Sequence, residues 1–111
     1  MQPLCALVDI DPSGGREVSL RQDGGVRYIA LFRVGGGVRA YENVCPHQGR
    51  NLSFGPSEFL FTGEGQLVCP HHGACFEIAT GVCTEGPCKG ASLTPVDIVL
   101  EGSQVFLASD S

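Results

Sequence analysis

Two nearly matching hexapeptides constrain the fold of this 111-residue chain more than any other feature of its sequence. They are VCPHQG at residues 44–49 and VCPHHG at residues 68–73, and together they contain all three histidines. In each, proline fixes φ just after the cysteine, and glycine allows a sharp turn or a close approach four positions after it. The pattern predicts two similar loops that hold one metal centre, so the fold must bring them together.

The spacing of sulfur and nitrogen ligands indicates the kind of centre. Structural zinc sites usually take their cysteines and histidines in like pairs, whereas each loop here is mixed. A single residue separates Cys45 from His47, which suits a centre with two chemically distinct ends. A [2Fe–2S] cluster with two cysteines on one iron and two histidines on the other is such a centre. A closed zinc site is the alternative.

The remaining cysteines do not form an all-cysteine cluster motif. Cys83 and Cys88 have the first spacing of a plant-type pattern, but that pattern would next require cysteine where Ala91 stands, and it would leave the histidines unexplained. In a reducing cytosol we expect Cys83 and Cys88 to be free thiols, although oxidation could pair them. Cys5 and Cys75 fall on expected strands and should pack as small hydrophobes.

Composition and periodicity favour an all-β chain. The length suits one domain, and 16 Gly and 7 Pro without any Trp predict many turns and short strands. Apolar alternation between glycine clusters predicts strands, and only residues 51–61 are ambiguous enough to contain a helical turn. The expected strands are 4–10, 16–20, 27–34, 38–44, 74–78, 92–100 and 104–108.

The charge balance and the N-terminus bear on partners and compartment. A formal charge of −5 with no basic run makes nucleic acid an unlikely partner, and it would steer the protein towards a basic patch on another protein. No leader-like segment opens the chain, and no apolar run is long enough to span a membrane. We therefore expect a cytoplasmic protein with no membrane partner.

The sequence resembles the Rieske iron–sulfur family. The family pattern C-x-H, a spacer, then C-x2-H is matched by Cys45, His47, Cys69 and His72. The spacer, residues 48–68, is longer than in many members, which a surface loop can accommodate. Further matches are Gly49, Leu52, Cys-Pro-x-His-Gly at 69–73, Phe76, Thr-Gly at 80–81 and Gly-Pro at 86–87.

The resemblance implies a fold and a ligand set. It implies a single Rieske domain over residues 1–111, with an antiparallel β-sandwich base and an inserted cluster-binding subdomain at about 43–88. Cys45 and Cys69 would hold a buried inner iron, while His47 and His72 would hold an outer iron near the surface. Gly86-Pro87 resembles the family's third, covering loop.

Some positions near the cluster are open to more than one interpretation. Spacing alone would also allow His71 as a ligand, but the family pattern assigns the histidine immediately before glycine, which is His72, and leaves His71 on the surface. Glu42 and Asn43 either hydrogen-bond within the first loop or simply end a strand.

The resemblance also implies a low reduction potential. High-potential family members have a disulfide at the positions of Arg50 and His71, and hydroxyl donors at the positions of Ala74 and Phe76. This chain has neither. The reduced cluster would therefore be less stabilised.

These observations predict an electron carrier and not an enzyme. The sequence contains no nucleotide fingerprint, no mononuclear iron site and no nucleophile–base pair. The expected function is a stand-alone ferredoxin that passes single electrons from a flavin-dependent NAD(P)H reductase to a terminal ring-hydroxylating oxygenase. One alternative is a small Rieske subunit of a larger oxidoreductase, such as assimilatory nitrite reductase. The other is a zinc-stabilised interaction module.

Overall fold

The computed structural model describes residues 2–22, 24–35, 37–44, 52–53, 58–70, 73–86 and 89–108. The expected all-β class is confirmed, because the one helix in these ranges is a single 3-10 turn, η1 (Leu7–Asp9). No helix in the described part of the chain is long and apolar enough to cross a membrane. The strands are β1 (Gln2–Ala6), β2 (Arg16–Gln22), β3 (Gly25–Val34), β4 (Gly37–Glu42), β5 (Leu60–Phe61), β6 (Leu67–Val68), β7 (Cys75–Phe76), β8 (Cys83–Glu85), β9 (Ile98–Glu101) and β10 (Gln104–Leu107).

Two antiparallel three-stranded sheets form the base of the molecule. One sheet has the order β1-β10-β9 and the other β2-β3-β4. Glycines with positive φ close the hairpins, as at Gly24 (φ 80°) between β2 and β3 and at Gly102 (φ 60°) between β9 and β10. The two sheets enclose an apolar core with members from both. The buried members of this core are Ile10, Leu20, Ile29, Leu31, Val38, Ala40, Val96, Val105 and Leu107.

The middle of strand β3, residues 29–32, is buried on both faces. This explains why apolar residues follow one another there without a polar residue between them. Ile29 and Leu31 belong to the core of the base, whereas Ala30 and Phe32 belong to a second core on the opposite face. Successive side chains of a strand point to opposite faces of its sheet. A strand that serves two cores therefore loses the polar alternation of a half-exposed strand.

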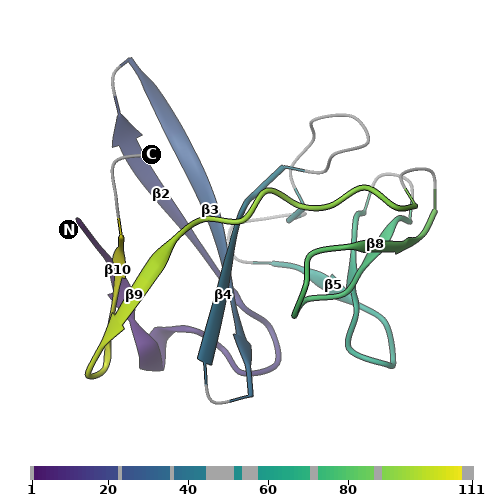
Figure 1. Ribbon diagram of the computed structural model, residues 1–111, viewed down its shortest axis with the longest axis horizontal. Helices are drawn as coiled ribbons and strands as arrows, with labels where there is room; N and C mark the ends of the chain where they lie inside the picture. Colours follow the sequence, from purple (N-terminus) through teal and green to yellow (C-terminus); the bar gives the residue numbers. More distant parts are fainter. Residues whose placement is uncertain are drawn as a thin grey trace.

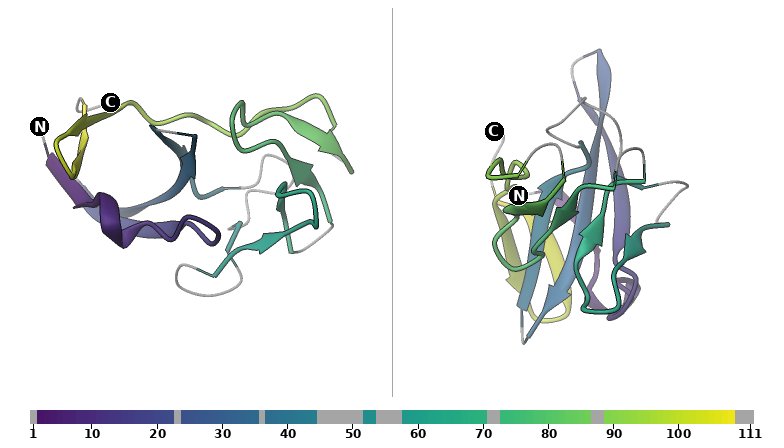
Figure 2. Two further views of the ribbon diagram at one scale, coloured as in Figure 1. Left: turned by 90° about the horizontal axis from the view of Figure 1, so that it is seen from below. Right: turned by 90° about the vertical axis from the view of Figure 1, so that its right-hand side faces the viewer.

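The second core joins the base to a four-stranded sheet of order β5-β6-β7-β8. This sheet lies to one side of the base in Figure 1 and in the left view of Figure 2. The chain then returns along β4, where Glu42 N donates to Thr94 O (2.9 Å) and Val96 N donates to Ala40 O (2.9 Å). Other members of the second core are Tyr41, Leu52, Phe59, Leu67, Cys69, Ala74, Phe76, Cys83 and Leu93.

Three expected strands are shorter than the apolar patterns suggested. The first ends at Ala6, because Leu7–Asp9 forms the 3-10 turn, whose Leu7 O accepts from Ile10 N (3.1 Å). The segment at 92–100 becomes a regular strand only at Ile98, after Pro95, which has no amide to donate to a ladder. The strand expected at 74–78 is confined to Cys75 and Phe76. Within 51–61, the described residues show the short strand β5 and no helix.

Candidate metal centre

The structure places one of the four predicted ligands. Cys69 is described, whereas Cys45, His47 and His72, like the alternative His71, lie outside the described residues. In the described ranges no three His, Cys, Asp or Glu side chains gather to hold a metal ion. The parts of the predicted centre that the structure describes are Cys69 and the ends of the three loops.

The second loop, residues 69–74, begins at Cys69 directly after β6. The Cys69 side chain is only 2% exposed. Cys69 N donates to Ala74 O (2.8 Å), and Gly73 N donates back to Cys69 O (3.0 Å). Gly73 has φ 72°, a conformation that favours glycine. Backbone hydrogen bonds therefore join the described ends of this loop, Cys69 on one side and Gly73 and Ala74 on the other.

The third loop, residues 83–91, packs directly on the second. Cys83 N donates to Ala91 O (2.8 Å) and Gly90 N donates to Cys83 O (3.0 Å), which closes the loop at its base. Gly86 has φ 102°, and a Cβ added there would lie 2.7 Å from the Cα of Ala74. A side chain at residue 86 would therefore separate the two loops. The close approach of Gly86 to Ala74 agrees with a covering role for the third loop at Gly86. Pro87 and Cys88 lie outside the described residues.

The first loop, residues 44–51, is closed by a side chain. Asn43 Oδ1 accepts a hydrogen bond from Leu52 N (2.9 Å), so one side chain joins the residues that flank the loop. Asn43 thus forms a side-chain hydrogen bond, but to the residue that follows the loop, and the part of the prediction that concerns residues 45–51 falls outside the described residues. Glu42 instead ends β4 and forms a bidentate ion pair with Arg27, whose Nε lies 2.9 Å from Glu42 Oε2.

The donor chemistry and burial at this end of the molecule fit an iron–sulfur cluster. Leu52, Cys69, Ala74 and Cys83, which lie at the ends of the three loops, share one buried apolar core. An isolated thiolate is costly to bury in such surroundings, but a thiolate bound to a metal is neutralised by it. The burial of Cys69 therefore suits a metal-bound thiolate.

Cys5 and Cys75 lie where the sequence predicted them. Cys5 lies on β1 against the base core and Cys75 is buried on β7. Burial raises the pKa of both thiols, so both stay protonated near neutral pH. Both therefore pack as small hydrophobes.

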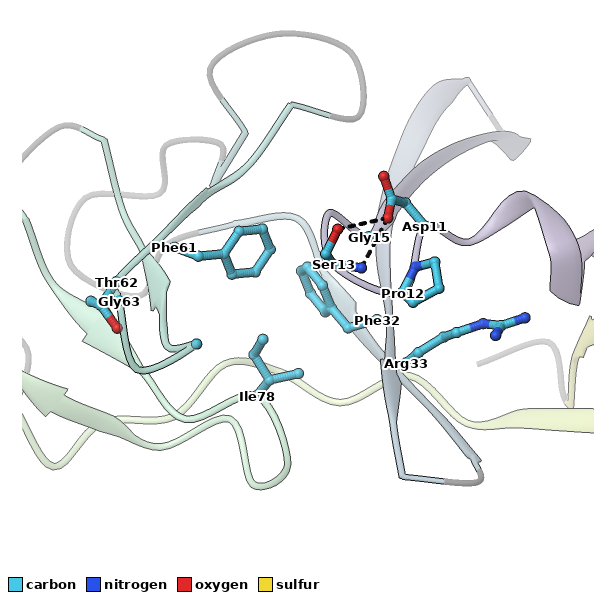
Figure 3. A pocket seen from close by; sticks show the side chains of 11 residues that line it. Asp11, Pro12, Ser13, Gly15, Phe32, Arg33, Phe61, Thr62, Gly63 and Ile78 are labelled. Carbon is cyan, nitrogen blue, oxygen red and sulfur yellow. Dashed lines mark hydrogen bonds between the residues drawn. The ribbon is translucent and has the colours of Figure 1, made fainter.

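A groove of about 350 Å³ lies elsewhere, between β3 and the turn that links β5 to β6. In Figure 3 the side chains of Phe32, Phe61 and Ile78 point towards one another across it. Asp11 in this groove accepts from the amide and hydroxyl of Ser13. Arg33 Nη2 donates to Leu7 O (3.0 Å), whereas Arg33 Nε is buried without a hydrogen-bond partner among the described residues. None of the described residues of the three loops lines this groove.

Comparisons with known proteins point to the same centre. The sequence model of the Rieske [2Fe-2S] domain matches residues 1–104. Ferredoxin CarAc of Metapseudomonas resinovorans is 30% identical over 108 residues, which cover 96% of this chain and 92% of the relative.

Two solved structures extend the comparison to the fold. The ferredoxin of carbazole 1,9a-dioxygenase from Nocardioides aromaticivorans IC177 has a TM-score of 0.71 and 25% identity, covering 97% of this chain and 98% of its own. A chain in a complex of reduced oxygenase and oxidized ferredoxin in carbazole 1,9a-dioxygenase has a TM-score of 0.70 and 28% identity, covering 96% and 99%.

Proposed function

This chain belongs to the Rieske [2Fe–2S] domain family, and on that premise we propose that Cys45, His47, Cys69 and His72 hold its cluster. The buried position of Cys69 supports an inner iron bound by the two cysteines. The two imidazoles then bind the outer iron, with residues 43–88 as the cluster-binding subdomain. Neutral imidazoles leave that iron less negative than thiolates would.

The protein is an electron carrier and not an enzyme. A Rieske cluster, when bound, takes up and releases one electron at a time. The chain's own residues bind the cluster, limit its exposure to water and set its potential. The zinc-stabilised interaction module is excluded by the family match, which implies a [2Fe–2S] cluster.

We further propose a terminal ring-hydroxylating oxygenase as the electron acceptor and a flavin-dependent NAD(P)H reductase as the donor. The observation that carries this proposal is the similar ferredoxin solved in complex with its oxygenase. The similarity extends over nearly the whole of that ferredoxin, which favours a shuttle over the alternative, a subunit of a nitrite reductase type of enzyme. We place the protein in the cytoplasm, where its thiols stay reduced.

Replacing each adjacent histidine tests the ligand set. We expect His72→Ala to abolish the visible absorption of the cluster and to lower iron and acid-labile sulfide. His71→Ala, the matched control one residue away, should keep all three signals. The opposite result would assign the outer iron to His71.

Electron transfer to candidate acceptors tests the partner. The protein is reduced anaerobically and mixed in a stopped-flow instrument with a ring-hydroxylating oxygenase or with a sirohaem nitrite reductase. We expect fast reoxidation by the oxygenase alone. Fast reoxidation only by the sirohaem enzyme would replace the shuttle with the subunit alternative.

A further inference from the structure

Asn43 is the only buried polar side chain among the described residues, and it lies two positions before the first predicted ligand. It is fully buried at the end of β4, on the face of the β2-β3-β4 sheet that carries the second core. A buried amide is costly unless its donors and acceptor are satisfied. The partners of Asn43 therefore indicate why a polar residue is retained there.

Its partners are the two residues that follow the first loop and a residue of β2. The Asn43 side chain accepts from Leu52 N (2.9 Å) and donates from Nδ2 to Ser53 Oγ (3.1 Å). Nδ2 also donates to the carboxylate of Glu17 on β2, which accepts in addition from Ser53 Oγ (3.3 Å). Both residues that follow the first loop are thus joined through Asn43 and Glu17 to the base sheet.

The three loops differ in how they are closed. Paired backbone hydrogen bonds close the second and third loops. In the described part of the chain, no backbone hydrogen bond joins Asn43 or Val44 to Leu52 or Ser53. Among the described residues, side chains alone therefore join the two ends of the first loop.

We infer that Asn43 is a positioning residue for the cluster: with Glu17 and Ser53 it fixes the ends of the loop that supplies Cys45 and His47. This inference rests on the proposed ligand set. A loosened loop would present its imidazole in a spread of geometries, and ligand orientation tunes both the retention and the potential of a metal centre. Loss of Asn43 should therefore affect the cluster before it affects the fold.

An exchange of the two polar groups tests the inference directly. Asn43→Asp keeps the acceptor for Leu52 N but places two carboxylates against each other, so we expect rapid cluster loss. Glu17→Gln is mild, because the new amide can turn its oxygen towards Asn43 Nδ2. The double variant, Asn43→Asp with Glu17→Gln, again places an amide donor opposite a carboxylate acceptor. It has the same total charge as the wild type. Its cluster half-life should return to within about twofold of the wild type.

Asn43→Ala removes the hydrogen bonds of residue 43 without adding a charge. Gln104→Ala is its matched control. Gln104 also hydrogen-bonds the backbone through its side-chain amide, but it lies on β10 of the other base sheet and donates from Nε2 to Cys5 O (2.9 Å). We expect Asn43→Ala to shorten the cluster half-life at least about threefold, and to speed hydrogen exchange at the Leu52 amide by roughly tenfold for the lost hydrogen bond. Gln104→Ala should change neither.

The spectroscopic readout separates positioning from a general structural role. In folded Asn43→Ala protein, verified by far-UV circular dichroism, we expect a shifted midpoint potential and broader EPR lines of the reduced cluster. Unchanged potential and lines, or a double variant no better than Asn43→Asp, would overturn the inference. If Asn43→Ala does not fold, the double variant decides. A wild-type protein without iron and sulfide would instead contradict the proposed ligand set.

Discussion

Ala74 and Phe76 are buried side chains beside the second loop, and neither carries a hydroxyl. Ala74 O accepts from Cys69 N (2.8 Å), which keeps residue 74 next to a predicted ligand. A hydroxyl donor near the cluster sulfurs would stabilise the added negative charge of the reduced state. Because both donors are missing, we expect a potential near the bottom of the Rieske range of about −150 to +300 mV.

Restoring the two hydroxyls should raise that potential. We expect Ala74→Ser and Phe76→Tyr each to raise the midpoint by roughly 40 mV, for a hydrogen bond worth about 1 kcal/mol in the reduced state. Voltammetry of the purified variants measures the change. Phe61→Tyr, on β5 at the groove, adds the same hydroxyl away from the loops and should leave the potential unchanged. A double variant without an upward shift would contradict the argument.

Individual site residues differ in how far the sequence could predict them. The turn that begins at Cys69 could be predicted because the spacing of proline and glycine within a short loop is a local pattern, while its role as a ligand stays a prediction. The network at Asn43 could not, because its partner Glu17 lies 26 positions away on another strand and neither residue belongs to a motif. The sequence raised a hydrogen bond at Asn43 as one of two possibilities. The structure shows the bond to Glu17, which forms because β2 and β4 flank β3 in one sheet.

At the scale of elements, the contact between Gly86 and Ala74 predicts a difference between two glycines of the same loop. Gly86 and Gly90 both have φ near 100°, but a Cβ at Gly90 would meet no atom within 4 Å. Gly90→Ala should cost about 1 kcal/mol of unfolding free energy for backbone strain alone. Gly86→Ala should cost a further 1–3 kcal/mol, roughly, from the clash.

Urea unfolding of the two variants measures this difference. Cluster absorbance should also decay faster in Gly86→Ala, because the covering loop can no longer lie against the second loop. Equal unfolding free energies and equal cluster lifetimes would show that the close approach at Gly86 does not matter.

Tyr41 links the base to the small sheet and predicts a dependence on alkaline pH. Its hydroxyl donates to Ile78 O (2.5 Å), and a Cβ at Gly81 would lie 2.8 Å from its ring. Tyr41→Phe should lower the unfolding free energy by about 1 kcal/mol at neutral pH. Tyr28→Phe is the control. It should change the unfolding free energy little, because Tyr28 is 43% exposed.

The pH dependence follows from the pKa of Tyr41. Desolvation by burial raises this pKa above the usual value of 10.0, with Glu77 adding to the effect and Arg39 opposing it. The stabilising effect of the neutral phenol is therefore complete below pH 10 and is lost as the pH rises through the raised pKa. The stability gap between wild type and Tyr41→Phe should shrink in that alkaline range. A gap that stays constant there would contradict this assignment.

The strand predictions succeeded where glycine turns frame regular hairpins and failed where the chain joins the two parts of the molecule. The hairpins β2–β3–β4 and β9–β10 lie where the sequence predicted them. The strands β5, β6 and β8 have two or three residues each, too few for a period to be recognised. The apolar stretch before Ile98 lies along β4 without forming a regular strand, because it packs between two cores.

At the scale of the whole molecule, the net charge of −5 predicts docking that depends on salt. An oxidised cluster does not alter that charge, because its 2+ core balances two thiolates. Reduction by the cognate reductase should slow severalfold as salt is raised from about 50 to 300 mM, where screening shortens the range of attraction. Reduction by a small uncharged donor serves as the control. A reductase rate indifferent to salt would exclude electrostatic steering.

The hydrogen bond from Glu42 N to Thr94 O has a consequence for protein engineering. It places the point where the chain leaves the base beside the point where it returns, so residues 43–93 form a cassette whose two joints need only a short gap. We expect this segment to be transferable to another β-sandwich at a hairpin of similar width, provided that the recipient also offers an acceptor for Asn43 in place of Glu17. The recipient must offer a small apolar platform in place of Ala30, Phe32 and Tyr41, and removing the cassette here would require polar replacements at those three positions.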